Sequence, residues 1–219
     1  MDRREKLKES FLNFLRTAGD LMVLNWLWVI CALPLVTFGP ASCALYAVTL
    51  KLARGEHAPP FREFFKAFRD NFKNGLVLGL IALALAVVAY VDYAFAMGQQ
   101  GMLHTVYLVL AIVLLAVLLS FLCYAFSLQA TFENTLTAQI KNAFAVPFAA
   151  PGKTVMMWLI TLFPVAALLL PRVVISMLGF IYLIAGASGP AYLNSRLLRD
   201  VFDKINGAPI RPKDEDGEE

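Results

Sequence analysis

Long apolar runs separated by short polar connections dominate the pattern of this chain. Clear runs cover 75–97 and 103–128, and two more cover 154–170 and 173–193. A helix needs about 20 mostly apolar residues to cross a bilayer, so each run approaches or reaches the length of a membrane span. The short connections leave no room for a folded soluble domain. The pattern therefore predicts one all-α membrane bundle over residues 1–206.

The first apolar stretch, 20–54, is interrupted in its middle. Pro34, Gly39 and Pro40 stand within the sequence LPLVTFGPA, and one straight helix cannot run through them. The pattern predicts two short segments that form a broken hairpin, which gives about six membrane-embedded segments in all. A deep re-entrant hairpin is the alternative, because non-helical backbone is tolerated in a membrane where protein or water lines it.

A different periodicity follows this hairpin. Five phenylalanines recur at helical spacing opposite a mainly basic face: Phe61, Phe64, Phe65, Phe68 and Phe72. Pro59 and Pro60 before them suit the start of a helix. An aromatic stripe opposite basic residues is typical of an amphipathic helix lying in the membrane interface. Its simpler role is an anchor, and its more specific role is a docking surface for another protein.

The last third of the chain carries further signals. An apolar residue at every fourth position from Phe132 predicts a half-buried helix that ends before Pro147. The PGKT sequence at 151–154 lacks the earlier glycine of a phosphate-binding loop and is interpreted as a helix start. The last span is predicted to end at Leu193, before an amphipathic extension. Residues 207–219 end in an acidic run, which predicts a disordered cytoplasmic tail.

Composition agrees with a membrane location. Of the 219 residues 59% are hydrophobic and 16% are charged, with a mean hydropathy of +0.67, which is too apolar for a soluble domain of this length. The cysteines lie in apolar segments without metal-ligand spacing, so packing is their expected role. No cofactor and no metal site are predicted.

The cationic residues decide the predicted topology. If 20–54 enters and returns on one side, all but one of the 19 lysine and arginine residues share that side, and Arg172 faces the other. Cations favour the cytoplasmic side, so both termini are predicted to be cytoplasmic. The basic clusters lie close to the spans, which indicates attraction to the lipid bilayer and no nucleic-acid partner.

Few polar groups interrupt the apolar runs, and these are the functional candidates. Ionisable groups inside a span are candidates by default, but Asp92 lies near the end of its span, where a carboxylate can face water. Asn25 is expected to be an interhelical hydrogen-bond partner. The break is expected to be a tight turn, with a substrate site as the alternative. The candidate residues are Asp20, Asn25, Pro34, Thr37, Gly39, Pro40 and Asp92.

Several of these stretches are similar to one family. The blocks that carry the resemblance are Asp20 with LNWLW, LPLVTFGPASCALYAVTLKLARGE, FREFFKAFRDNFK, FENTLTAQIKNAF and GPAYLNSRLLRDVF. They resemble the YesL-like family of small bacterial integral membrane proteins, a domain of unknown function. The resemblance implies a location in the bacterial cytoplasmic membrane and an association with genes for carbohydrate uptake and polysaccharide breakdown, including sugar ABC transporter components. It implies no catalytic or ligand residues.

Two functions from different classes fit these observations. No enzyme motif is present, so no enzymatic activity is predicted. The first hypothesis is an accessory or scaffolding protein linked to carbohydrate uptake, with a sugar ABC transporter or another membrane protein as partner. The alternative is a small transporter or channel that uses the broken hairpin 20–54.

Gly75 and Gly79 have the spacing that lets a helix approach closely, and such small residues allow a homodimer without requiring one.

Overall fold

The structure, a computed structural model, describes residues 3–56, 59–132, 135–167, 179, 182 and 184–206. Its described elements are all helical, which confirms the predicted class. In chain order they are α1 (Arg3–Ala32), η1 (Leu35–Thr37), α2 (Phe38–Ala53), α3 (Pro60–Asp70), α4 (Phe72–Met97), α5 (Gly101–Thr131), α6 (Leu136–Ala149), α7 (Pro151–Ala167) and α9 (Ser188–Asn206).

Four described helical segments are long and apolar enough to cross a membrane. They are Phe11–Ala32, Leu35–Ala53, Phe72–Met97 and Gly101–Thr131. Helix α6 and most of α7 form a fifth candidate, bent by 106° between the two helices. The chain is therefore a helical membrane protein. The predicted spans 154–170 and 173–193 lie partly outside the described residues, and the tail 207–219 lies wholly outside them.

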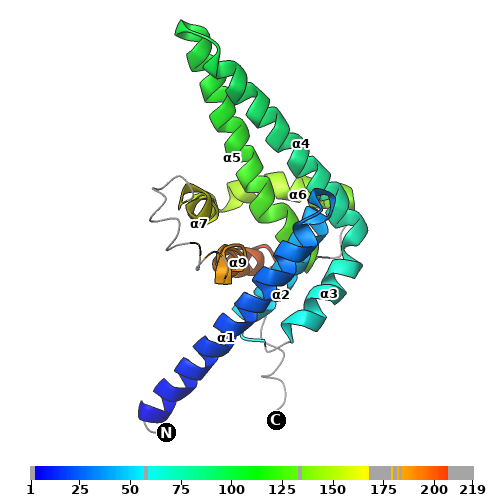
Figure 1. Ribbon diagram of the computed structural model, residues 1–219, viewed down its shortest axis with the longest axis vertical. Coiled ribbons are helices and arrows are strands. Elements are labelled where there is room, and N and C mark those ends of the chain that lie inside the picture. Colours follow the sequence, from blue (N-terminus) through cyan, green and yellow to red (C-terminus); the bar gives the residue numbers. More distant parts are fainter. Residues whose placement is uncertain are drawn as a thin grey trace.

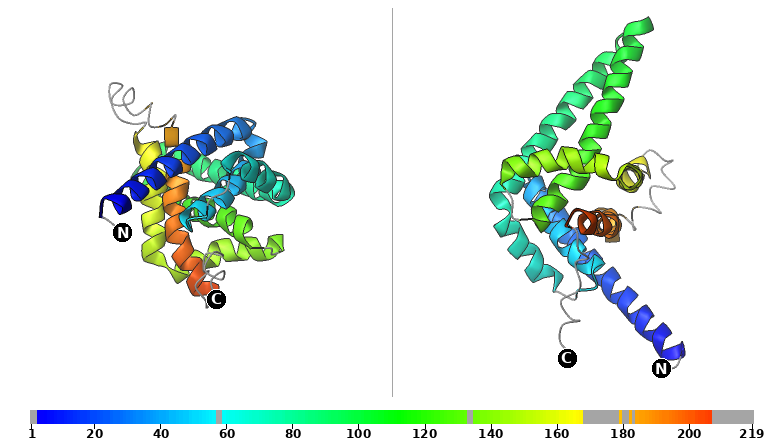
Figure 2. Two further views of the ribbon diagram at one scale, coloured as in Figure 1. Left: turned by 90° about the horizontal axis from the view of Figure 1, so that it is seen from below. Right: turned by 180° about the vertical axis from the view of Figure 1, so that it is seen from behind.

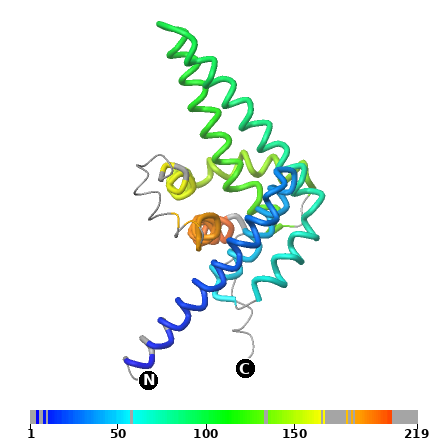
Figure 3. The backbone as a smooth tube through the Cα atoms, in the orientation of Figure 1, coloured from blue at the N-terminus to red at the C-terminus, as the bar shows by residue number. Residues whose placement is uncertain are grey.

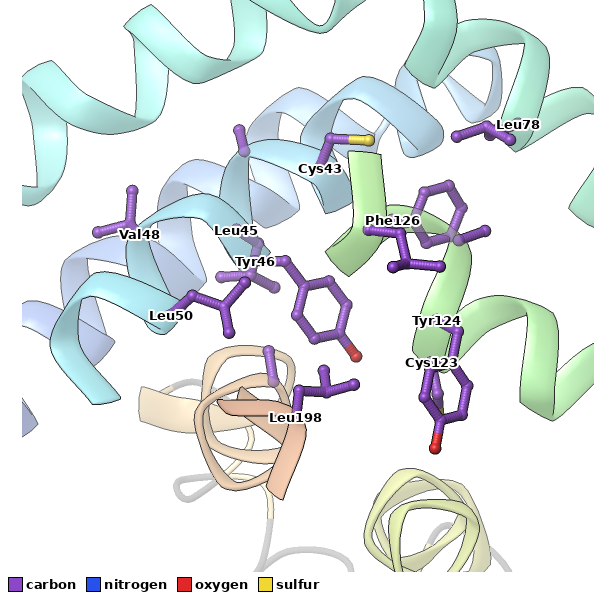
Figure 4. Close-up of a cluster of buried hydrophobic side chains, with 14 of the residues drawn as sticks. Cys43, Leu45, Tyr46, Val48, Leu50, Leu78, Cys123, Tyr124, Phe126 and Leu198 are labelled. Carbon is purple, nitrogen blue, oxygen red and sulfur yellow. The ribbon is translucent and has the colours of Figure 1, made fainter. Parts of the chain in front are cut away.

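Helix α2 lies at the centre of the bundle. It packs against α1, α3, α4, α5 and α9, and 67% of its candidate span is buried, compared with 17% to 28% for the other three. Seen from below, α9 lies between α7 and α2 (Figure 2). Side chains from several helices meet around α2, including Tyr46 from α2 itself, Tyr124 from α5 and Leu198 from α9 (Figure 4). The second half of the broken hairpin is therefore surrounded mainly by protein.

Helices α4 and α5 form a long antiparallel hairpin that projects from this core (Figure 1). Both are apolar around most of their circumference, and many of their large apolar side chains are exposed, as expected for helices that meet lipid. The turn between them lies at the opposite end of the molecule from the N-terminal end of α1, as the backbone trace shows (Figure 3). The long axis of the molecule therefore runs from that turn to the start of the chain.

Two predicted boundaries are wrong. Helix α6 continues through Pro147 to Ala149, because a proline in the last turn removes a single helical hydrogen bond, and the Pro147 carbonyl accepts from Thr154 Oγ1 at 3.0 Å. Helix α9 runs from Ser188 to Asn206, so no boundary at Leu193 separates a span from an extension.

Candidate functional site

The break after α1 is a tight turn closed by one threonine. The Thr37 amide and hydroxyl both donate to the Pro34 carbonyl, at 2.8 Å each, and the hydroxyl also lies 2.6 Å from the Cys31 carbonyl. These bonds occupy carbonyls that the end of a helix leaves without partners. The side chains of Leu35 and Val36 beside them are exposed. Backbone groups of the break are thus engaged within the chain, as in a simple turn.

Gly39 and Pro40 lie beyond this turn, in the first turn of α2. Proline is tolerated there because its missing N–H would have no helical partner. A Cβ atom on Gly39 would collide with the Gly75 carbonyl and would lie 2.8 Å from the Gly79 nitrogen. A Cβ atom on Gly75 would lie 2.9 Å from Pro40. The predicted close approach at Gly75 and Gly79 is therefore confirmed, and the neighbouring helix is α2.

Asn25 joins α1 to the start of α9. Its side chain is buried, with 2% of the residue exposed; Nδ2 donates to the Tyr182 carbonyl at 3.1 Å, and Oδ1 accepts from the amides of Ala187 and Ser188 at 2.8 and 3.4 Å. The first amides of a helix have no partner within it, so Asn25 supplies an acceptor from another helix. This is the interhelical role expected from the sequence.

A cavity of about 430 Å³ lies between α1, α2, α5, α7 and α9. Its volume falls within the range of about 300 to 1,000 Å³ that small-molecule sites occupy. Its described lining is mostly apolar and contains no charged side chain. The polar residues in it include Asn25, Ser42, Tyr46, Thr161, Tyr182 and Asn194. Of the candidates from the sequence, Asn25 lines the cavity.

Asn194 is the centre of a small polar network in the cavity wall. Its Nδ2 donates to Thr161 Oγ1 at 3.0 Å and lies 4.0 Å from Cys123 Sγ, which is 3.5 Å from the same hydroxyl. Tyr46 reaches from α2 toward Cys123 on α5 (Figure 4). Asn194 is 1% exposed, and its Oδ1 has no hydrogen-bond partner. The network therefore leaves one buried acceptor unused.

The two acidic candidates do not join this cavity. Asp92 is half-buried near the distal end of α4, beside Phe95 and Tyr107, and its Oδ2 is buried without a hydrogen-bond partner. Asp20 is half-buried on α1. The described lining of the cavity includes neither of them, nor Thr37. The structure thus separates residues that the sequence presented as one candidate set.

The phenylalanine stripe is divided between core and surface. Phe64 is fully buried and stacks on half-buried Phe68, with ring centroids 6.3 Å apart. Phe61 and Phe65 are 61% and 41% exposed, and Phe72, at the start of α4, is 38% exposed. Phe64 is therefore unavailable to a partner. The exposed part of the predicted docking surface consists of Phe61, Phe65 and Phe72.

An ion pair holds α3 against α2. Lys51 Nζ lies 2.7 Å from Glu63 Oε2, and the hydrogen bond from Lys51 lowers the pKa of the Glu63 carboxyl below its ordinary value of 4.5. Together with the buried ring of Phe64, this contact orients the exposed face of the helix.

Sequence reasoning missed most polar residues of the cavity. Single residues such as Ser42, Thr161 and Asn194 interrupt apolar runs in the same way whether they face a cavity or a neighbouring helix. Asn194 also stood where the last span was predicted to end. Within the described part of the chain, no group of three or more histidine, cysteine, aspartate or glutamate side chains could hold a metal ion.

Comparisons with known proteins give a family without a function. The family described as "Protein of unknown function, DUF624" matches residues 21–93. "Uncharacterized protein YesL" of Bacillus subtilis (strain 168) is 30% identical over 142 residues, which cover 63% of this chain and 66% of YesL. "Uncharacterized protein YteU" of the same strain is 29% identical over 142 residues, 63% of each chain. The match thus spans just under two thirds of either relative, and no solved structure matches significantly.

Proposed function

This chain belongs to the YesL-like family of proteins of unknown function, and we propose that it is an accessory membrane protein that binds a component of a carbohydrate uptake system through α3. The carbohydrate association rests on what the family resemblance implies, which is an associational argument. The choice of α3 as the docking element rests on the geometry of its aromatic side chains.

One observation carries the proposal: α3 is held firmly on one face and shows aromatic rings on another. Phe64 and the Lys51–Glu63 ion pair fix the helix to the bundle. Phe61 and Phe65 pack edge to face, with centroids 4.9 Å apart, and both remain exposed. Aromatic residues are enriched in interface hot spots, and a rigid surface loses little entropy when it binds.

The basic residues of α3 favour one chemical kind of partner. Arg62, Lys66 and Arg69 are exposed on the same helix as the two rings. Basic residues beside an aromatic patch favour an acidic segment with apolar side chains, because complementary charges steer association and set specificity. We therefore expect the partner to present such a segment.

The proposed topology places α3 and both termini on the cytoplasmic side of a bacterial membrane. The distribution of lysine and arginine supports it. The start of α1 and the α4–α5 turn lie at opposite ends of the molecule, which also agrees with this topology (Figure 1).

Transport is the second candidate, and the cavity beside Asn25 is the observation that favours it. Two features favour the accessory role instead. Thr37 closes the break as a turn, and the described cavity lining offers too few polar groups for the many hydroxyls of a sugar. Glucose uptake into vesicles that hold the purified protein alone, above that of empty vesicles and lost in Asn25→Leu, would reverse this preference.

Replacing the exposed rings tests the accessory role. The double variant Phe61→Ala, Phe65→Ala removes both rings and leaves Phe64 in the core. We expect the wild type, purified from native membranes in mild detergent, to retain a sugar-transporter component. The double variant should retain it at least about tenfold less, since each tenfold corresponds to about 1.4 kcal/mol and hot-spot rings commonly exceed that value.

A matched control separates docking from a general loss of apolar surface. Phe148→Ala removes a ring that is 85% exposed at the end of α6. It should retain the same component as the wild type. Equal retention by the double variant, or a wild type that brings down no carbohydrate-transport component, would contradict the proposed function.

A further inference from the structure

We propose that the cavity binds an uncharged single-chain lipid with a hydroxyl-bearing head, such as a monoacylglycerol. This inference does not depend on the accessory role. A second hollow, of about 530 Å³, lies between α7 and α9. It shares Pro164, Tyr182, Gly186 and Pro190 with the cavity, so the two hollows adjoin. Together they form an elongated site with two chemically different ends.

The outer end is an apolar groove that is open at the side of the molecule. Leu159 and Phe163 of α7 are 64% and 71% exposed, and Leu193 of α9 is 48% exposed on the other wall. Gly189 also lines this groove, where its lack of a side chain keeps the space open. Within a bilayer, exposed apolar walls face acyl chains, so an alkyl chain can enter from the membrane without crossing water.

The inner end offers hydrogen-bond partners that the protein itself leaves unused. The Oδ1 atom of buried Asn194 has no hydrogen-bond partner, and neither has the buried Tyr182 hydroxyl. Both residues line the cavity. Buried polar atoms are rarely left unpaired in folded proteins, which indicates that something else completes them. Both atoms have almost no accessible surface, so a ligand hydroxyl pairs with them once the side chains of Asn194 and Tyr182 turn toward the cavity.

Pro164 adds another acceptor beside this end. Because proline has no amide hydrogen, the Ile160 carbonyl lacks the helical donor that residue 164 would otherwise provide. Both residues line the groove, and Pro164 also lines the inner cavity. Pro164 of α7 therefore lies at the junction of the apolar and polar ends.

The described lining of the site carries no charged side chain, and this favours one class of ligand. Among the described residues, neither hollow is lined by an aspartate, glutamate, lysine, arginine or histidine. A buried charged head would lack a counter-ion and lose its hydration, which is strongly unfavourable. A free sugar would leave most of its hydroxyls unpaired. A neutral head with one or two hydroxyls on one alkyl chain matches both ends.

Native mass spectrometry of the delipidated full chain tests this inference with 1-monooleoylglycerol as the probe. Oleate, which has the same chain and a charged head, and glucose, which has no chain, are the comparison ligands. We expect monooleoylglycerol to bind at least about tenfold more tightly than oleate, a difference of about 1.4 kcal/mol, and glucose not to bind. Equal binding of oleate, or binding of glucose alone, would overturn the assignment.

A matched pair of leucine substitutions locates the binding. Gly189→Leu fills the groove, and a Cβ atom there meets the nearest side-chain atom at 3.4 Å, which is ordinary contact. Gly152→Leu adds the same side chain to α7 where a Cβ atom meets nothing within 4 Å. Binding should fall at least about tenfold in Gly189→Leu and stay unchanged in Gly152→Leu. Unchanged binding in both variants would show non-specific lipid association and sink the proposal.

A measurement on the wild type alone keeps the test decisive if Gly189→Leu does not fold. A monoacylglycerol with a diazirine near the end of its chain is irradiated with the full-length protein in detergent. Labelling should concentrate on peptides containing residues 156–163 and 189–193. Labelling spread evenly over the exposed faces of α4 and α5 would contradict a specific site.

Discussion

Gly39, Gly75 and Gly79 let α2 and α4 cross with backbone against backbone. Helices inside a membrane gain little from the hydrophobic effect when they associate, so close van der Waals packing provides much of their attraction. A side chain at this crossing acts in two ways, because it introduces a clash and also separates the rest of the interface. Single methyl groups are therefore expected to matter more here than on the lipid-facing surface.

Gly39→Ala tests this crossing. The added Cβ atom would meet the Gly75 carbonyl, and overpacking of a well-packed site costs about 1 to 3 kcal/mol. We expect a lower midpoint of thermal unfolding, followed by circular dichroism in detergent. Gly19→Ala is the control, because its Cβ atom would meet nothing within 4 Å. Equal midpoints for Gly39→Ala and the wild type would show that α2 and α4 are not in close contact.

Asn25 and Asn194 show how far a single residue can be interpreted from sequence. A polar side chain inside an apolar run needs a partner, so the interhelical role of Asn25 was predictable. The identity of that partner was not, because Ala187 is 162 residues away along the chain. Asn194 follows directly after Leu193, where the sequence predicts the end of a span, and only the fold shows that this residue lines a cavity and has a buried Oδ1 without a partner.

At the scale of the element, α3 illustrates the same limit. Phenylalanine spacing predicted the helix, and the structure confirms its start at Pro60. All five rings fell in one stripe, yet Phe64 is fully buried and Phe61 is 61% exposed. The stripe is wider than the contact that α1 and α2 offer, so neighbours that lie elsewhere in the sequence decide which rings are covered.

The Lys51–Glu63 pair should make the docking of α3 dependent on pH. Because the pKa of Glu63 is lowered in the folded state, its contribution is present above the ordinary value of 4.5 and is lost as the pH falls through the lowered pKa. Both side chains are partly solvated, so this contribution is below about 1 kcal/mol. Hydrogen exchange of α3 should be slower in the wild type than in Glu63→Gln at about pH 6, and the difference should shrink as the pH falls through the lowered pKa of Glu63.

Comparing the wild type with Glu63→Gln at the same pH removes the intrinsic pH dependence of amide hydrogen exchange from this test. The amides of α5 serve as an internal control, since neither residue of the ion pair lies on α5. A difference between the two proteins that does not shrink as the pH is lowered would contradict an electrostatic origin.

For the whole molecule, the sequence indicated the membrane but not which segments lie inside the protein. Mean hydropathy separates the candidate spans only partly: it is 1.4 for Leu35–Ala53 and 3.0 for Gly101–Thr131. Low hydropathy does not by itself indicate burial, because Phe11–Ala32 has a value of 1.3 and is 17% buried, whereas Leu35–Ala53 is 67% buried. Burial of α2 by five neighbouring helices is a property of the assembled bundle, so it cannot be predicted from the residues of α2 alone.

The hairpin made by α1 and α2 leads to a definite topology. Because the chain reverses at η1, Glu9 and Arg69 should lie on the same side of the membrane, and Gln99, in the α4–α5 turn, should lie on the other. Single cysteines at these three positions can be labelled in intact cells with a membrane-impermeant maleimide. Gln99→Cys should react, whereas Glu9→Cys and Arg69→Cys should react only after the membrane is opened. The parent chain is the control for its own Cys31, Cys43 and Cys123. Labelling of Glu9→Cys from outside while Arg69→Cys stays protected would mean that 20–54 crosses once, which would remove both the hairpin topology and the cytoplasmic N-terminus.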